Sequence, residues 1–147
     1  MHKLFLFLFL LSFTTLRGQR GVYTTANAHS HNDYEKADPF FEAYKHQFGS
    51  IEADVFLVSG SGDLYVAHHR SDLDKKRRTL DSLYLMPLVQ CIRKNKGFVY
   101  ADTSRKLQLM IDIKTEAVPT LNRLIEILRT YPELINTPGL QVVISGN

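Results

Sequence analysis

Two acidic residues on one predicted strand are the side chains best suited to chemistry in this sequence. Glu52 and Asp54 stand two residues apart in the otherwise apolar stretch Ser50–Val58. Because successive side chains of a strand point to opposite faces, both carboxylates leave the same face. Two carboxylates aimed at one point repel each other unless a cation or a shared proton lies between them. Their oxygen atoms favour Mg²⁺ or Ca²⁺, and the alternative is a set of salt bridges to nearby lysine or arginine side chains.

A third carboxylate, Asp112, is flanked by Ile111 and Ile113, where an unpaired charge is costly. It is either a third ligand of the same cation or half of a buried ion pair with Lys114. Asp112 and Lys114 are two residues apart on a predicted strand, so they share a face. We therefore expect Lys114 to neutralise a phosphate beside the cation.

Two histidines supply groups for proton transfer. His31 and His68 are the predicted general base and general acid, because imidazole gains and loses a proton near neutral pH. The alternative is that each is a polar surface residue. His29 can share the face of His31, whereas His69 should point away from His68. A zinc site built from these histidines is a further alternative, although the i, i+4 spacing of metalloproteases is absent from the sequence.

Strand and helix patterns alternate along the chain, which predicts a parallel sheet. The charged stretch 71–79, with the basic run 75–78, is expected to be a solvated loop. We expect strands over 22–28, 50–58, 64–67, 107–113 and 140–145, and helices over 38–48, 87–95 and 119–129.

The polar clusters fall at or just after the ends of predicted strands, and in αβ barrels the C-terminal ends of the strands form the active face. The sequence stops at Gly146-Asn147, directly after a predicted strand. We therefore expect an α/β fold of the TIM-barrel type, with residues 20–147 forming its N-terminal half. A four-stranded open sheet is the alternative.

Composition and the first residues set further expectations. The net charge of +3 suits an anionic substrate and does not indicate nucleic acid. Residues 1–19 are typical of a secretory signal peptide, because the apolar stretch Leu4–Phe13 is short for a membrane span. We expect a secreted or periplasmic protein, with an uncleaved membrane anchor as the alternative. The single cysteine, Cys91, excludes an internal disulfide and is expected to be a buried structural thiol.

Several stretches together resemble the phospholipase-C-like phosphodiesterase superfamily, which includes glycerophosphodiester phosphodiesterases and sphingomyelinase-D-like enzymes. Within it, the chain is most similar to the branch of the fungal "altered inheritance of mitochondria" phosphodiesterase-like proteins. The resemblance covers most of the chain after the signal, and it is carried by His29-Ser30-His31-Asn32-Asp33-Tyr34, Ile51-Glu52-Ala53-Asp54-Val55, Leu64-Tyr65-Val66-Ala67-His68, Thr79-Leu80-Asp81-Ser82-Leu83-Tyr84-Leu85 and Leu109-Met110-Ile111-Asp112-Ile113-Lys114.

The resemblance implies a TIM-type barrel and a role for each matching residue. Glycerophosphodiesterases usually carry His-Arg-Gly and Glu-Asn-Thr, whereas here His31 is followed by Asn32-Asp33 and Glu-Asn-Thr is absent. On this comparison Asn32 replaces the phosphate contact of the arginine, and Asp33 supplies a carboxylate. The implied ligands of a divalent cation, usually Mg²⁺ or Ca²⁺, are Glu52, Asp54 and Asp112; the implied catalytic histidines are His31 and His68, with Lys114 facing the phosphate.

These expectations combine into one functional hypothesis and one alternative. The hypothesis is an exported, metal-dependent phosphoric diester hydrolase that acts on a small or lipid-derived phosphodiester, with some contact with membrane surfaces. The alternative is a non-catalytic barrel that binds a phosphate ligand, or an inactive truncated homologue. The sequence leaves the substrate head group, the identity of the metal and the oligomeric state open.

Overall fold

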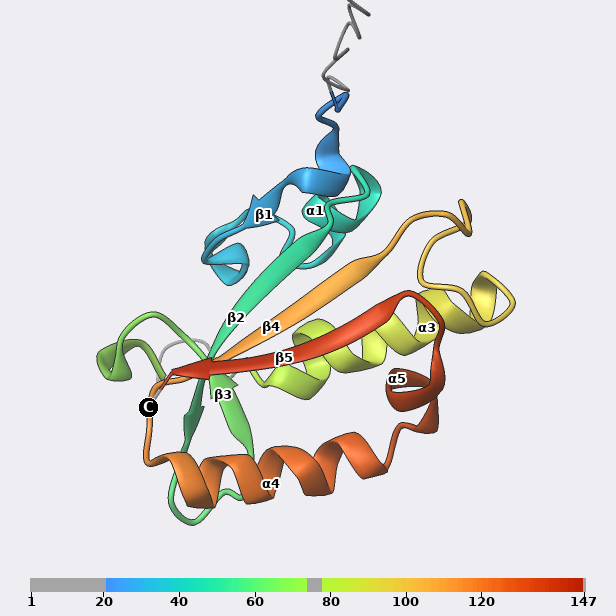
Figure 1. Cartoon of the computed structure of the whole chain (residues 1–147). Helices are drawn as coiled ribbons and strands as arrows, with labels where there is room; N and C mark the ends of the chain where they lie inside the picture. Colours follow the sequence, from blue (N-terminus) through green and yellow to red (C-terminus); the bar gives the residue numbers. More distant parts are fainter. Residues whose placement is uncertain (1–20, 74–77, 147) are drawn as a thin grey trace, which may run out of the picture.

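A parallel β-sheet organises the chain. The computed structural model describes residues 21–73 and 78–146 (Figure 1). Four strands are parallel in the order β1-β2-β4-β5, and β3 pairs antiparallel with β2. The fold is therefore mixed α/β with a parallel sheet, as predicted. The strands are β1 (His29–Ser30), β2 (Ser50–Leu57), β3 (Leu64–Val66), β4 (Leu107–Ile113) and β5 (Leu140–Gly146).

Helices and short turns connect these strands. The predictions for the two longest helices are confirmed to within two residues at each end. The short helix α5 was not predicted. The helices are α1 (Phe41–Lys45), α3 (Met86–Lys94), α4 (Ala117–Arg129) and α5 (Pro132–Asn136). The 3-10 turns are Thr25–Asn27, Asp33–Glu35 and Arg70–Asp72, and a π-helical turn, Asp81–Leu85, leads directly into α3.

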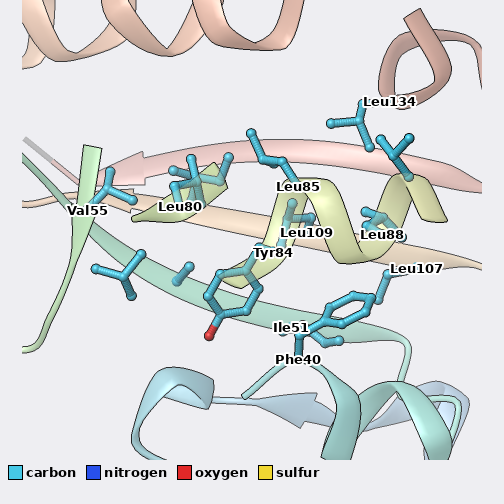
Figure 2. Packing of buried hydrophobic residues seen from close by; sticks show 14 of the residues in the cluster. Phe40, Ile51, Val55, Leu80, Tyr84, Leu85, Leu88, Leu107, Leu109 and Leu134 are labelled. Atoms are coloured by element: carbon cyan, nitrogen blue, oxygen red, sulfur yellow. The ribbon is translucent and has the colours of Figure 1, made fainter. Parts of the chain in front are cut away.

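The sheet has one apolar face and one polar face. Along β4 every second side chain is buried, from Leu107 to Ile113, and the residues between them are partly exposed. Leu107 and Leu109 of this buried set share a core with Leu85 of the π-helical turn and Leu88 of α3 (Figure 2). The strand period of two then puts the alternate residues on the opposite face, away from this core. These alternate residues include Glu52, Asp54 and Asp112.

The predicted first strand over 22–28 is wrong, because polar turn contacts replace it. Thr24 accepts a hydrogen bond from the amide of Ala26, and the side chain of Asn27 accepts one from the amide of Thr24. This pair of contacts forms a capping box that closes the 3-10 turn. Val22 and Tyr23 are 85% and 88% exposed and lie outside the strands of the sheet. The first strand is β1, which begins at His29.

The first helix is shorter than the predicted span 38–48. Phe40, immediately before α1, has a φ angle of +66°, which is incompatible with a helix that continues from residue 38. Its side chain is fully buried, and its amide donates a hydrogen bond of 2.6 Å to Asp33. Burial and this bond hold the strained backbone in place.

The parallel strands lie side by side in the order in which they occur along the chain, β1-β2-β4-β5. In a doubly wound sheet this order would reverse partway across the sheet. This strand order is consistent with a TIM-type barrel, which stays a prediction.

The predicted signal peptide, residues 1–19, and most of the basic run 75–78 lie outside the described residues. None of the helices formed by residues 21–73 and 78–146 combines the length and hydropathy that a bilayer-spanning segment requires.

Candidate active site

Three carboxylates from two strands converge on the polar face of the sheet. One oxygen each of Glu52, Asp54 and Asp112 lies within 4.8 Å of the other two. The strand register explains this convergence, since Asp54 lies directly opposite Asp112 in the parallel pairing of β2 and β4. Glu52 reaches the same point from the same face of β2. Within the described chain, this is the group of three acidic, histidine or cysteine side chains that has the geometry to hold a cation.

Asp54 has one oxygen that is well contacted and one that is not. Its side chain is 1% exposed, and Oδ2 lies 2.9 Å from the hydroxyl of Tyr34 and 3.2 Å from Nζ of Lys114. Oδ1 is buried and has no hydrogen-bond partner among the described residues. A buried carboxylate oxygen without a partner is costly. A cation bound at Oδ1 would remove that cost, so this atom fits a metal ligand.

Lys114 is paired with two of the three acids. Its Nζ contacts Oδ2 of both Asp54 and Asp112. The hydrogen bond with Asp112 is the main cause that raises the pKa of Lys114. Burial alone would raise the pKa of Asp112, but hydrogen bonds from Lys114 and Ser145 outweigh it and lower that pKa. The ion pair and the acidic cluster, which the sequence presented as alternatives, therefore occur together.

The charge of the cluster suits a divalent cation. Three carboxylates contribute −3 and Lys114 contributes +1, which leaves −2 at the site. All three candidate ligands are carboxylates, whose hard oxygen atoms select Mg²⁺ or Ca²⁺ over softer metals. Glu52, Asp54 and Asp112 thus fit the predicted cation on both charge and donor type.

Two histidines lie beside different carboxylates of the acidic cluster. Nε2 of His31 is 3.7 Å from Oε2 of Glu52, and Nδ1 of His68 is 3.6 Å from Oδ2 of Asp54. The His31 side chain is 71% exposed, which leaves its ring accessible to a ligand. The structure therefore brings both predicted catalytic histidines to the cluster.

His29 has closer contacts with the cluster than His31. Its Nε2 lies 3.2 Å from Oε2 of Glu52, and its Nδ1 lies 2.8 Å from Oγ of Ser50. These two contacts fix the ring and orient Glu52. From the sequence, His29 was expected only to share the face of His31. The pairing of His29 with Ser50 between β1 and β2 is what brings His29 to Glu52. His69 packs against the ring of His68.

Asn32 lies at the rim of the cluster and contacts it through its backbone. Its φ and ψ angles of 48° and 44° are left-handed, a conformation that asparagine tolerates better than most residues. Its amide donates a hydrogen bond of 3.3 Å to Oε2 of Glu52. Its side-chain oxygen lies 3.0 Å from the hydroxyl of Tyr34. Contact of Asn32 with a substrate stays a prediction.

The assignment of Asp33 to substrate binding needs correction, because its side chain is fully buried. Oδ1 accepts a hydrogen bond of 2.7 Å from Ser30, and Oδ2 accepts bonds from the Phe40 amide and the Tyr84 hydroxyl. Both oxygens are therefore used within the chain. Asp33 stabilises the segment that carries His31 and Asn32, which is a structural role.

Sequence reasoning missed two further residues of the site. Tyr34 donates to Asp54 from a buried position, and no spacing pattern announces that contact. Ser145 donates a hydrogen bond of 2.7 Å to Oδ1 of Asp112. A signal for Ser145 was present, because it lies opposite Asp112 once the predicted strands are paired in parallel.

A cavity of about 410 Å³ adjoins the histidines. His29 and His31 form the part of its wall that also contacts Glu52. Lys36, His46 and Phe48 are among its other lining residues. Its volume is in the range of small-molecule sites.

Known proteins match most of the chain. Proteins named "Altered inheritance of mitochondria protein 6" are 37% identical to it in Kluyveromyces lactis and 41% identical in Lachancea thermotolerans, over 61% and 65% of this chain and 27% and 25% of those proteins. A homologue in Arthroderma benhamiae is 37% identical over 60% of this chain and 33% of that protein. The chain therefore spans about a quarter to a third of the length of these relatives. No solved structure matches it.

The family assignment agrees with the residues that form the site. The profile of the AIM6-like phosphodiesterase domain matches residues 19–134, a span that includes the three acids, both predicted catalytic histidines and Lys114. Ser145 lies beyond this span. The chain belongs to the AIM6-like phosphodiesterase domain family.

Proposed function

We propose that this chain forms the N-terminal part of a metal-dependent phosphoric diester hydrolase with a TIM-type barrel. Its substrate would be a small or lipid-derived phosphodiester. The observation that carries the proposal is the cluster of Glu52, Asp54 and Asp112, in which a buried oxygen of Asp54 has no partner among the described residues. The family name supports the reaction class.

Glu52, Asp54 and Asp112 would hold the cation. A bound Mg²⁺ or Ca²⁺ would stabilise the negative charge that develops on the phosphoryl oxygens. Lys114, whose ammonium group lies within the cluster, would neutralise a further phosphoryl oxygen. His29 would keep Glu52 in its orientation through the contact of 3.2 Å.

His31 and His68 would carry the protons of the reaction. His31 would take a proton from the attacking oxygen, which belongs to water or to a hydroxyl of the substrate, as that oxygen bonds to phosphorus. His68 would donate a proton to the leaving alkoxide as the other phosphorus–oxygen bond breaks. Their positions beside different carboxylates of the cluster, Glu52 and Asp54, are consistent with action from two sides of one phosphate.

Hydrolysis of bis-p-nitrophenyl phosphate tests the proposal. We expect release of p-nitrophenol by the longer natural protein that contains this segment to require Mg²⁺ or Ca²⁺ and to stop with a chelator. Glu52→Gln and His31→Ala should each lower turnover by about 100-fold or more, in line with general acid–base and metal contributions. Asp102→Asn is the matched control, because Asp102 is an exposed acid whose contacts are local.

Unchanged turnover in both site variants would exclude this site. A second outcome would identify the alternative, a barrel that binds a phosphate ligand without turnover. The pairing of Lys114 with two of the acids favours that alternative, because it reduces the charge of the cluster without a metal. Calorimetry that detects binding of inorganic phosphate or a diester by a protein without hydrolytic activity would support it.

We also propose export through the segment 1–19, with some contact between the mature protein and membrane surfaces. We propose no nucleic-acid partner. The mass of the mature protein recovered from its natural compartment tests cleavage near residue 19. A retained first segment would contradict it.

A further inference from the structure

We propose that Tyr34 is a positioning residue whose hydroxyl links Asp54 to His68 and holds the His68 ring with its proton on Nδ1. The effect on catalysis rests on the proposed function, whereas the hydrogen-bond arrangement does not. Tyr34 is 1% exposed. Its hydroxyl lies 2.9 Å from Oδ2 of Asp54 and 3.3 Å from Nδ1 of His68.

The direction of the hydrogen bonds follows from the number of protons. A tyrosine hydroxyl donates one hydrogen bond and accepts others through its lone pairs. Two oxygens compete for that proton: the carboxylate of Asp54, at 2.9 Å, and the neutral amide oxygen of Asn32, at 3.0 Å. The charged acceptor forms the stronger bond, so the proton goes to Asp54. Burial is the main cause that raises the pKa of Tyr34, and the hydrogen bond to Asp54 raises it further, so the hydroxyl stays protonated.

The remaining contact then defines the state of His68. Because the hydroxyl proton is directed to Asp54, the oxygen of Tyr34 accepts a hydrogen bond from Nδ1–H of His68. The carboxylate of Asp54, at 3.6 Å from Nδ1, favours a proton on the same nitrogen. The neutral ring then has its free lone pair on Nε2. This is the nitrogen that can bind a proton and deliver it to a leaving group.

The backbone around Tyr34 is fixed from several sides. Its carbonyl oxygen accepts a hydrogen bond of 2.7 Å from Arg78. The preceding residue, Asp33, is anchored by Ser30, Phe40 and Tyr84. The hydroxyl is therefore held by packing and backbone contacts as well as by its polar partners. A rigid support of this kind is what a residue needs to orient its neighbours.

The same bond affects the cation site. Tyr34 and Lys114 both contact Oδ2 of Asp54, so Oδ1 is the oxygen that stays available. Loss of the hydroxyl would allow the carboxylate to rotate. Tyr34 thus connects the position of His68 to the position of a candidate metal ligand.

The test compares Tyr34→Phe with Tyr100→Phe, each of which removes one buried hydroxyl and keeps the ring. Tyr100 is 2% exposed, and its hydroxyl donates a hydrogen bond to the carbonyl oxygen of Phe48, outside the acidic cluster. Long-range ¹H–¹⁵N NMR spectra of the neutral His68 ring report which nitrogen carries the proton. We expect Nδ1–H in the wild-type chain and in Tyr100→Phe, and a mixture of tautomers in Tyr34→Phe.

Activity and metal binding supply two further measurements. In Tyr34→Phe we expect kcat to fall by about 10- to 100-fold with a smaller change in KM, and Mn²⁺ to bind more weakly by calorimetry. Tyr100→Phe should keep both values close to those of the wild-type protein, even if its unfolding midpoint falls by a similar amount.

Two results would overturn the proposal. One is a wild-type His68 ring with its proton on Nε2, which is decisive even if Tyr34→Phe does not fold. The other is a folded Tyr34→Phe variant with an unchanged tautomer and unchanged Mn²⁺ affinity. An absence of hydrolysis in the wild-type protein would refute the proposed function alone, because the NMR and calorimetric measurements would still decide the role of Tyr34.

Discussion

Asp54 and Asp112 lie directly opposite each other on the parallel strands β2 and β4, and Lys114 contacts Oδ2 of both. The ammonium group reduces the repulsion between two acids that the strand register forces together. The Glu52 carboxylate completes the cluster without an ion pair to lysine or arginine within the described chain. The resulting excess of negative charge makes the response to cations the most direct property to measure.

Mg²⁺ or Ca²⁺ should raise the midpoint of thermal unfolding of the wild-type chain. A ligand that binds only the folded state stabilises it by about 2.7 kcal/mol at a concentration of 100 times Kd. Asp54→Asn should lose most of this shift, because it removes a charge at the centre of the cluster. K⁺ at equal ionic strength and the variant Asp102→Asn are the controls. An equal shift in Asp54→Asn and Asp102→Asn would show that the cation binds elsewhere.

The ion pair of Asp112 with Lys114 should be visible in the pH dependence of metal-free stability. The pKa of Asp112 is lowered from 3.8, so its contribution is present above that value and is lost as the pH falls through the lowered pKa. The pKa of Lys114 is raised from 10.5, so its contribution is present below that value and is lost as the pH rises through the raised pKa.

Lys114→Met should therefore lower the free energy of unfolding at neutral pH and remove the lysine's part of the alkaline loss. Urea unfolding of both proteins in a chelator, across the acidic, neutral and alkaline range, measures these changes. Parallel pH profiles for the two proteins would contradict the prediction, since the pair would then contribute nothing that depends on protonation.

Asp33→Ala should destabilise the fold rather than weaken substrate binding directly. The variant leaves the Ser30 hydroxyl, the Phe40 amide and the Tyr84 hydroxyl without their acceptor. Each unsatisfied buried donor costs about 1–3 kcal/mol, so a loss of several kcal/mol is expected in urea unfolding. Asp63→Ala, on an exposed turn, is the control. Wild-type stability combined with a raised KM would instead support the substrate-binding role that the sequence suggested.

Gly146→Ala should impair the site next to Asp112. Gly146 has a φ angle of +100°, and an added Cβ would lie 2.9 Å from Oδ1 of Asp112 and would clash with the backbone of Ile113. Gly60→Ala is the matched control, because its φ angle is +85° and nothing lies within 4 Å of the added Cβ. Both variants incur the left-handed backbone cost of about 1–2 kcal/mol. Gly146→Ala should lose more stability and also bind Mn²⁺ more weakly. Equal effects of the two substitutions would contradict this steric argument.

Local periodicity was sufficient for the elements and for part of the site. The bounds of β4 were predicted to the residue, and β2 to within one residue at its end. The period of two placed Glu52 and Asp54 on one face, because side-chain direction in a strand depends only on position along that strand. The parallel arrangement then followed from the alternation of strands and helices, since parallel strands need a crossover connection.

Contacts between distant segments set the remaining features. Asp33 and Tyr84 are 51 residues apart, and their hydrogen bond converts an expected substrate contact into a buried support. Tyr34 reaches Asp54 across 20 residues, and His29 reaches Glu52 across 23. The residue types along the chain were enough to suggest a cation and proton donors. Packing and strand register assigned each group its partner, because a side chain's hydrogen bonds depend on which distant atoms the fold brings within about 3 Å.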